Sequence, residues 1–250
     1  MGDVMAALVA AITSVVVTVI SLEVAGRQRR HEAHLEHREE INVRYLNPLR
    51  RQVAEMSSRL VQILYSIEAD TERRRLLGII GDPDELLGES AAWFAGEGYF
   101  LASTAYLTAS LFAWIERVRR DHPFLRLTGI DDTALTELLV KVQFAFVRDL
   151  GIYYHLQPSI GENMWYGDDG RLRTYREFCS LLTDPEHLVW FRRIFLYYIE
   201  TARGEKLDRI QEAIEAIHDL ARHLDRYVAG SGSLAGPLAA EATRPSPAPR

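Results

Sequence analysis

Three histidines stand among glutamates in a charged segment near the start of the chain. His31, His34 and His37 repeat at steps of three residues. On a helix such side chains spread over about 120°, so the three cannot converge on one metal ion, although two of them with a glutamate could. We interpret the segment as a solvated polar face. A pH response at a membrane surface is the functional alternative, because imidazole groups titrate near neutral pH.

A second candidate for metal chemistry is the E-x-x-H element formed by Glu215 and His218. Di-iron helical bundles use this element twice. The second copy is missing here, since Asp184 and His187 give only D-x-x-H. The sequence also contains no phosphate-binding loop, dinucleotide fingerprint, nucleophile elbow or zinc-binding HExxH helix. We therefore predict no catalytic residue, no cofactor and no metal, and favour a non-enzymatic protein.

Glu97 is the carboxylate with the most unusual sequence surroundings. It lies between Gly96 and Gly98 in an otherwise apolar region. A carboxylate in such surroundings must pair with a cation, bind a ligand or take up a proton. We predict a possible ligand pocket formed by Glu97 with Trp93 and Tyr99, since pockets combine aromatic rings with a few polar groups. An ion pair with an arginine, or an exposed bend, is the structural alternative.

Two large aromatic residues stand in a segment rich in turn formers. Trp165 and Tyr166 belong to the run NMWYGDDG. Residues 158–173 as a whole predict a loop or small hairpin, because glycine, proline and aspartate gather there. Large rings in loops often contact partners, so we predict Trp165 and Tyr166 as a partner contact. Packing of the loop onto the domain is the alternative.

The first apolar stretch sets the predicted location of the protein. Residues 4–22 are nineteen uncharged positions, close to the roughly 20 needed to cross a bilayer. Arg27, Arg29 and Arg30 follow, and basic residues beside a span stay on the cytoplasmic side. We predict a single-pass anchor in a bacterial inner membrane, with the N-terminus outside and the lipid bilayer as a partner. A cleaved signal peptide and a buried soluble helix are the alternatives.

A second apolar stretch covers residues 99–115 and also carries no charge. It is shorter and more polar than the first. A second span would place arginines 117, 119 and 120 on the side opposite Arg27, Arg29 and Arg30, which the positive-inside rule disfavours. We predict the central buried helix of a bundle, with a second membrane span as the alternative.

Two stretches of the chain show the seven-residue apolar repeat of packed helices. The first repeat consists of Leu49, Val53, Met56, Leu60, Ile63 and Ile67. The second consists of Leu207, Ile210, Ile214, Ile217, Ala221, Leu224 and Val228. These coiled-coil-like seams predict an antiparallel bundle within one chain, while pairing across a homo-oligomer stays open.

Local signals predict where the helices begin. Proline at position 48 is expected to interrupt the preceding helix, with Asn47 capping the next one. Asp82 and Asp184 each precede a proline and predict two further helix starts. Gly96 and Gly98 predict a break within the helical region that follows Asp82.

The overall composition excludes one class of partner and indicates a source. The 250-residue chain has a net charge of −6, whereas nucleic-acid binding requires a basic surface. We expect no nucleic-acid partner. Lys141 and Lys206 are the only lysines among 29 basic residues, which is typical of the coding bias of a GC-rich bacterium. The single cysteine, Cys179, is consistent with a reducing compartment.

These features together predict an all-α protein: one N-terminal transmembrane helix, then a cytoplasmic helical bundle with a small loop or hairpin insertion. The expected parts are an anchor at residues 1–26, a polar helical stalk at 27–46, a helical domain at 47–229 and a disordered tail at 230–250. The favoured function is a membrane-anchored scaffold, sensor or protein-interaction module. A membrane-tethered helical enzyme or ligand sensor using the pocket around Glu97 is the alternative.

Overall fold

The computed structural model describes residues 40–125, 129–167 and 170–227, and of residues 122–125 and 129–132 and of Tyr227 it describes the backbone alone. The predicted anchor, the arginines at 27, 29 and 30, the histidines of the stalk and the C-terminal tail therefore lie outside the described residues. Within the described part, no helix is both long enough and apolar enough to span a bilayer. Contacts divide the chain into units at residues 1–44 and 45–250, and the second unit is described below.

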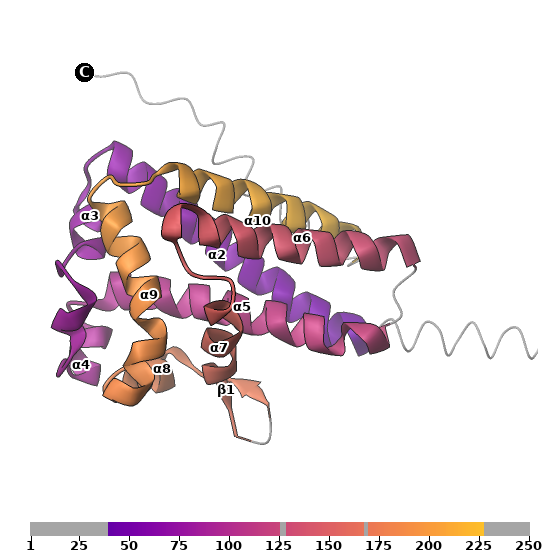
Figure 1. The fold of residues 1–250 in the computed structure, drawn as a ribbon, viewed down its shortest axis with the longest axis horizontal. Helices are drawn as coiled ribbons and strands as arrows, with labels where there is room; N and C mark the ends of the chain where they lie inside the picture. The colour runs from indigo at the N-terminus through magenta and orange to yellow at the C-terminus, as the bar shows by residue number, and fades with distance from the viewer. Residues whose placement is uncertain (1–39, 126–128, 168–169, 228–250) are drawn as a thin grey trace, which may run out of the picture. The chain divides into compact units, whose positions relative to one another are not determined.

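The second unit is an all-α bundle with one small hairpin, as the sequence predicted (Figure 1). A π-helical turn, η1 (Asn42–Leu46), precedes the first long helix. The elements that follow are α2 (Asn47–Glu68), α3 (Glu72–Leu77), η2 (Pro83–Leu86), α4 (Ala91–Ala95), α5 (Tyr99–Leu125), α6 (Gly129–Val147), η3 (Arg148–Leu150), α7 (Leu156–Asn163), β1 (Trp165–Tyr166), β2 (Arg171–Leu172), α8 (Tyr175–Leu181), α9 (Pro185–Ala202) and α10 (Asp208–Tyr227).

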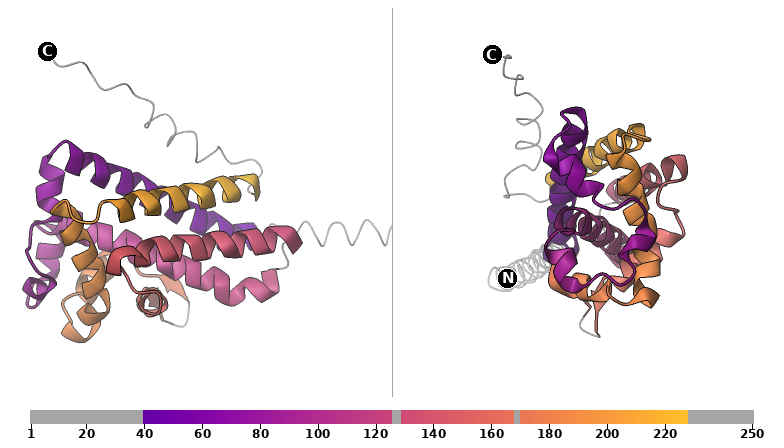
Figure 2. Two further views of the ribbon diagram at one scale, coloured as in Figure 1. Left: turned by 45° about the horizontal axis from the view of Figure 1, so that its top comes forward. Right: turned by 90° about the vertical axis from the view of Figure 1, so that its left-hand side faces the viewer.

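Four long helices, α2, α5, α6 and α10, make the centre of the bundle. Helix α10 packs against α6 and α2, and α5 packs against α2 and α7. Figures 1 and 2 show α6 and α10 side by side. The short helices α3 and α4 gather at the end of the bundle where α5 begins, whereas α2 starts at the opposite end (Figure 1). The chain thus enters the bundle at one end and places α3 and α4 at the other.

The two predicted apolar seams form the interface between α2, α10 and their neighbours. Every seam residue of α2 is buried, with exposures from 0% to 7%. In α10 the seam residues Ile210, Ile217, Ala221 and Leu224 are buried as well. Burying a large aliphatic side chain contributes about 1.5–3 kcal/mol. Internal packing of the two seams is therefore a main source of stability for this unit.

The second apolar stretch, 99–115, lies within α5 and is mostly buried. Leu101, Ala105, Leu111, Phe112 and Ile115 are at most 1% exposed. The prediction of a central buried helix is confirmed. The helix is longer than the sequence suggested, because it continues through Pro123 to Leu125.

The cap residues predicted from the sequence have mixed outcomes. Asp184 caps α9, with its side chain accepting a 2.9 Å hydrogen bond from the Glu186 backbone N–H. Asp82 caps η2 in the same way, but η2 is a 3-10 turn of 4 residues and not the start of the long helical region expected there. The prediction for Asn47 is wrong: the preceding Leu46 is already helical, with φ −76° and ψ −39°, and no side chain caps α2. A π-helical turn carries the backbone into Pro48, so no non-helical cap is formed.

The region 158–173 forms the predicted hairpin only in its second half, because its first half is helical. Helix α7 extends to Asn163, and only the part beyond it forms a hairpin. Strands β1 and β2 are antiparallel, with Trp165 opposite Leu172 and Tyr166 opposite Arg171. Gly167 and Gly170 have φ of +56° and +58°, backbone conformations that glycine adopts without steric cost. The hairpin projects from the bundle beside α7 (Figure 1).

Candidate functional site: an arginine cleft and a hairpin surface

A cleft of about 370 Å³ lies where α2, α3 and the start of α5 meet. We name it the arginine cleft, and its lining residues are Arg59, Gln62, Arg73, Leu76, Gly96, Glu97, Tyr99 and Phe100. Its volume falls near the lower end of the range of about 300–1,000 Å³ typical of small-molecule sites. Two members of the predicted pocket, Glu97 and Tyr99, belong to it. The volume of the arginine cleft is sufficient for a small ligand.

Arg59 of α2 is held in place by α5. Its Nη1 donates hydrogen bonds to the carbonyl oxygen of Phe100 at 3.2 Å, to Ser103 Oγ at 2.9 Å and to Thr104 Oγ1 at 2.8 Å. Its guanidinium also lies 4.7 Å from the centroid of the Phe100 ring. These bonds all come from one nitrogen. Within the described chain, Nε and Nη2 of Arg59 have no hydrogen-bond acceptor.

The charge balance of the arginine cleft is unusual. Burial lowers the pKa of Arg59, and the neighbouring Arg73 also lowers it, while no carboxylate contributes among the main causes. Neither arginine forms a salt bridge with any carboxylate of the described residues. Glu97 is exposed at the rim and likewise forms no ion pair within that part of the chain. The cleft is thus lined by two arginines and one glutamate that form no ion pair among the described residues.

Trp93, the third residue of the predicted pocket, does not line the cleft. Its indole lies over Gly98, so closely that a Cβ built on that glycine would come within 2.1 Å of the ring. The same ring makes an edge contact with Phe94, with centroids 5.3 Å apart. Gly98 is needed at this bend because the indole takes the space of a side chain. Trp93 therefore fixes the turn that carries Glu97 and Tyr99.

A second cleft, of about 520 Å³, lies between α3, the turn after it and the end of α9. Two of its three lining arginines, Arg74 and Arg203, already bind groups of the chain itself. Arg74 donates to the carbonyl oxygen of Ala202 at 2.8 Å and to Asp70 at 2.9 Å. Arg203 donates to the carbonyl oxygen of Gly81. These two guanidinium groups hold α3 and the turn after it against the end of α9.

The hairpin places the two predicted partner-contact residues in different surroundings. Trp165 is half-buried and packs edge-on against Trp114, with centroids 5.2 Å apart. Tyr166 remains 44% exposed. The guanidinium carbons of Arg171 and Arg173 lie 4.5 Å and 5.0 Å from the centroid of its ring. Of the two rings, Tyr166 is the one presented to solvent. Two arginine side chains lie against it.

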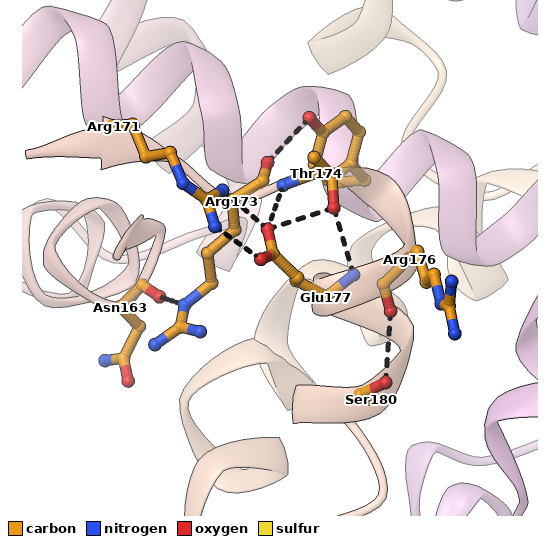
Figure 3. A network of polar contacts seen from close by, with 8 residues as sticks. Asn163, Arg171, Arg173, Thr174, Arg176, Glu177 and Ser180 are labelled. Atoms are coloured by element: carbon orange, nitrogen blue, oxygen red, sulfur yellow. Dashed lines mark hydrogen bonds and ion pairs between the residues drawn. The ribbon is translucent and has the colours of Figure 1, made fainter. Parts of the chain in front are cut away.

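A polar network fixes the hairpin to helix α8 (Figure 3). Glu177 accepts hydrogen bonds from Nη1 and Nη2 of Arg171 at 2.8 Å and 2.6 Å. It also accepts from the backbone N–H of Thr174 at 2.8 Å, and the Thr174 hydroxyl accepts in return from the Glu177 N–H. Arg171, followed by the hydrogen bonds from Thr174, holds the pKa of Glu177 well below its usual range. The Glu177 carboxylate therefore links the N-terminal cap of α8 to strand β2.

Arg173 adds two further bonds between the hairpin and the bundle. Its Nε donates to the carbonyl oxygen of Asn163 at 2.9 Å (Figure 3). Its own carbonyl oxygen accepts from the Tyr106 hydroxyl of α5 at 2.9 Å. The base of the hairpin is therefore tied to α5, α7 and α8. Such anchoring lowers the entropy that Tyr166 would lose on binding a partner.

The chain matches no protein-family model, no curated protein and no solved structure. The function must be inferred from the geometry itself.

The cysteine thiol and two tyrosine hydroxyls lie inside the bundle. Cys179 is buried, and burial raises its pKa. Burial also raises the pKa of Tyr197 and Tyr198, and the Tyr198 hydroxyl shares a 2.7 Å hydrogen bond with Thr108. In the same residues, no group of three His, Cys, Asp or Glu side chains could hold a metal ion.

Several residues of these two surfaces were not singled out from the sequence. The cap T-x-x-E at Thr174 and Glu177 is a recognisable helix-start signal and could have located α8. Arg59 carries no comparable signal, because nothing local distinguishes it from other surface arginines, and Arg73 stands out only as part of the basic run 73–75. Only the packing of α2 and α3 against α5 brings them beside Glu97.

Proposed function

We propose that this protein is a membrane-anchored helical interaction module whose hairpin contacts a protein partner. The predicted anchor at residues 1–26 would hold it at the cytoplasmic face of a bacterial inner membrane. The bundle supplies a rigid support, and the exposed ring of Tyr166 beside Arg171 and Arg173 supplies the contact. Its partner carries an acidic group that matches the Arg173 guanidinium, since Arg171 is already paired with Glu177.

The position of Tyr166 is the observation that carries this proposal. Tyrosine, tryptophan and arginine are the residues that contribute most to binding at protein interfaces. Here a 44% exposed tyrosine lies against Arg171 and Arg173. The base beneath it is hydrogen-bonded to three helices, so the ring is presented without large rearrangement. A ring kept only for packing would be expected to lie inward, as Trp165 does against Trp114.

Membrane attachment would support such a role by raising the local concentration of the protein beside its partner. Two proteins held at one membrane meet at a high effective concentration, so a modest contact area suffices. The mechanism proposed is tethering followed by hairpin contact, with no chemical step.

The membrane part is tested by fractionating cells that express the full chain. The anchor predicts that the protein sediments with membranes, resists extraction with carbonate and is released by detergent. Single cysteines at Leu35 and Leu125, in a Cys179→Ser background, should both react only when the inner face is open. Recovery of the full chain as a soluble monomer would refute the anchor.

The contact is tested by placing a photo-crosslinking amino acid at position 166 in cells. We expect a discrete cross-linked product that contains one partner protein. The matched control is position 65 of α2, where the native tyrosine is 64% exposed but has no arginine against its ring. Identical products at both positions, or none at 166, would contradict the hairpin contact. The size of the product also tells a second copy of this chain from a different partner.

A second function is favoured by a separate observation, the arginine cleft. A cleft of about 370 Å³ with three charged side chains that form no ion pair among the described residues is suited to a small polar ligand. In this alternative the tethered domain is a ligand sensor. Titration with charged small molecules tests it independently of the hairpin.

A further inference from the structure

We propose that the arginine cleft binds a small zwitterion, with its anionic group on Arg59 and Arg73 and its ammonium group at Glu97 and Tyr99. This inference rests on the second function above and deepens it by naming the class of ligand. It concerns residues of α2 and α3 that no sequence motif marks.

The anionic end follows from the state of Arg59. A half-buried guanidinium is costly when no anion compensates it. One nitrogen of Arg59, Nη1, donates all its hydrogen bonds to neutral oxygens of α5, which fixes the orientation of the guanidinium group. Nε and Nη2 form the edge of the fork that binds carboxylate or phosphate in a bidentate manner. Both lack an acceptor among the described residues, and Arg73 supplies a second positive charge beside them.

The ammonium end follows from Glu97 and Tyr99. A simple anion would be repelled by the Glu97 carboxylate at the rim of the same cleft. That carboxylate forms no ion pair within the described chain, so it is free to accept hydrogen bonds from an ammonium group. The ring of Tyr99 is 49% exposed and lines the same space. An ammonium group is attracted to the face of such a ring.

The size of the cleft limits the ligand further. Its volume of about 370 Å³ is suited to a molecule of amino-acid size. The ring of Tyr99 is itself supported by an edge contact with Tyr175, whose hydroxyl donates a 2.6 Å hydrogen bond to the Phe94 carbonyl oxygen. The wall that would receive the ammonium group is therefore held by three elements, α4, α5 and α8.

The test is calorimetric titration of the full-length protein in detergent with four probes. Two are zwitterions, 4-aminobutyrate and O-phosphoethanolamine, which separate a carboxylate ligand from a phosphate ligand. Two carry charge of one sign only, inorganic phosphate and ethylammonium. We expect at least one zwitterion to bind about tenfold more tightly than either single ion. Equal binding of phosphate and the zwitterions would refute the zwitterion while leaving a ligand site. No binding of any probe would refute both.

Variants assign the two ends of the ligand. Glu97→Gln should abolish the preference for the zwitterion over inorganic phosphate, and Arg73→Gln should weaken both. Arg59→Lys keeps the charge but loses the planar fork, and should also weaken both. The matched control is Arg51→Gln, which removes a charge from an exposed position of the same helix two turns earlier. Equal loss in Arg51→Gln and Arg73→Gln would show a general charge effect and overturn the proposal.

Discussion

Arg209 donates a 2.8 Å hydrogen bond from Nη1 to Oε2 of Glu200, which joins the start of α10 to the end of α9. The arginine side chain is fully buried. Its guanidinium carbon lies 3.9 Å from the centroid of the Tyr197 ring, and it also donates to the Tyr197 carbonyl oxygen. Lys206 contacts the same carboxylate at 3.0 Å. Glu200 therefore compensates the charge of an arginine placed inside the bundle.

Removal of that carboxylate is predicted to destabilise the fold. Glu200→Ala leaves the buried guanidinium of Arg209 without an anion, and breaking a buried pair costs about 3 kcal/mol. Urea denaturation should show this decrease in the free energy of unfolding, with little change in the dependence on urea. Glu215→Ala is the control, because Glu215 is exposed on α10. It should change the free energy by no more than about 0.5 kcal/mol. Equal effects of the two substitutions would contradict a structural role for the Arg209 pair.

His218 is predicted to make stability depend on pH near neutrality. Burial, followed by the charge of Arg222, lowers the pKa of His218 below its usual 6.5, although Asp219 opposes this. Its Nε2 atom is buried and has no hydrogen-bond partner in the described residues. The unfolded chain therefore binds a proton that the folded chain excludes. The contribution is complete above about pH 6.5 and is lost as the pH falls below it.

The corresponding measurement compares the wild type with His218→Gln between about pH 7.5 and about pH 5.5. The free energy of unfolding should fall more steeply with decreasing pH in the wild type, since glutamine does not titrate. Parallel curves for the two proteins would show that His218 takes up its proton equally well in the fold.

Glu177 is predicted to control the rigidity of the hairpin. Glu177→Gln removes the charge that pairs with Arg171 and weakens the cap at Thr174. The Arg173 backbone N–H donates to the Met164 carbonyl oxygen at 2.8 Å, so it reports on the base of the hairpin. Its hydrogen exchange should become faster in Glu177→Gln. Glu186→Gln, at an exposed position of α9, is the control. Unchanged exchange in Glu177→Gln would mean that the network does not hold the hairpin.

Gly98 is predicted to tolerate no side chain while Trp93 is present. A Cβ there would lie 2.1 Å from the indole, and such overpacking costs about 1–3 kcal/mol. Gly98→Ala should therefore lower the free energy of unfolding in the wild type. In a Trp93→Ala background the same substitution should cost less than about 1 kcal/mol, which a double-mutant cycle by urea denaturation measures. Equal costs in both backgrounds would show that the indole moves away freely.

The sequence anticipated the parts of the fold that depend on local periodicity. The apolar repeat of α2 predicted a buried face, and all its members are buried. Asp184 before a proline predicted the start of α9. The start of α2 was misjudged, because a proline at position 48 does not break a helix when a π-helical turn precedes it. Helix α7 was missed because Pro158 and Gly161 resemble turn formers in isolation.

Some residues of the candidate sites were likewise predicted from the sequence, whereas others were not. Glu97, Tyr99 and Tyr166 stood out by their neighbours in the sequence, and they line the cleft or the exposed hairpin. Trp93 shared the local signal of Glu97 but packs on Gly98 instead. Arg59 did not stand out at all.

By itself, the sequence determined the all-α class and the buried faces of α2 and α10, because helix periodicity is a property of residues close together in the chain. Only the tertiary structure decided that Arg59 and Arg73 share a cleft with Glu97 and that Arg209 is buried beside Glu200. Those arrangements depend on which helices pack together. The balance of charges inside them is set by contacts between different elements, which no local pattern encodes.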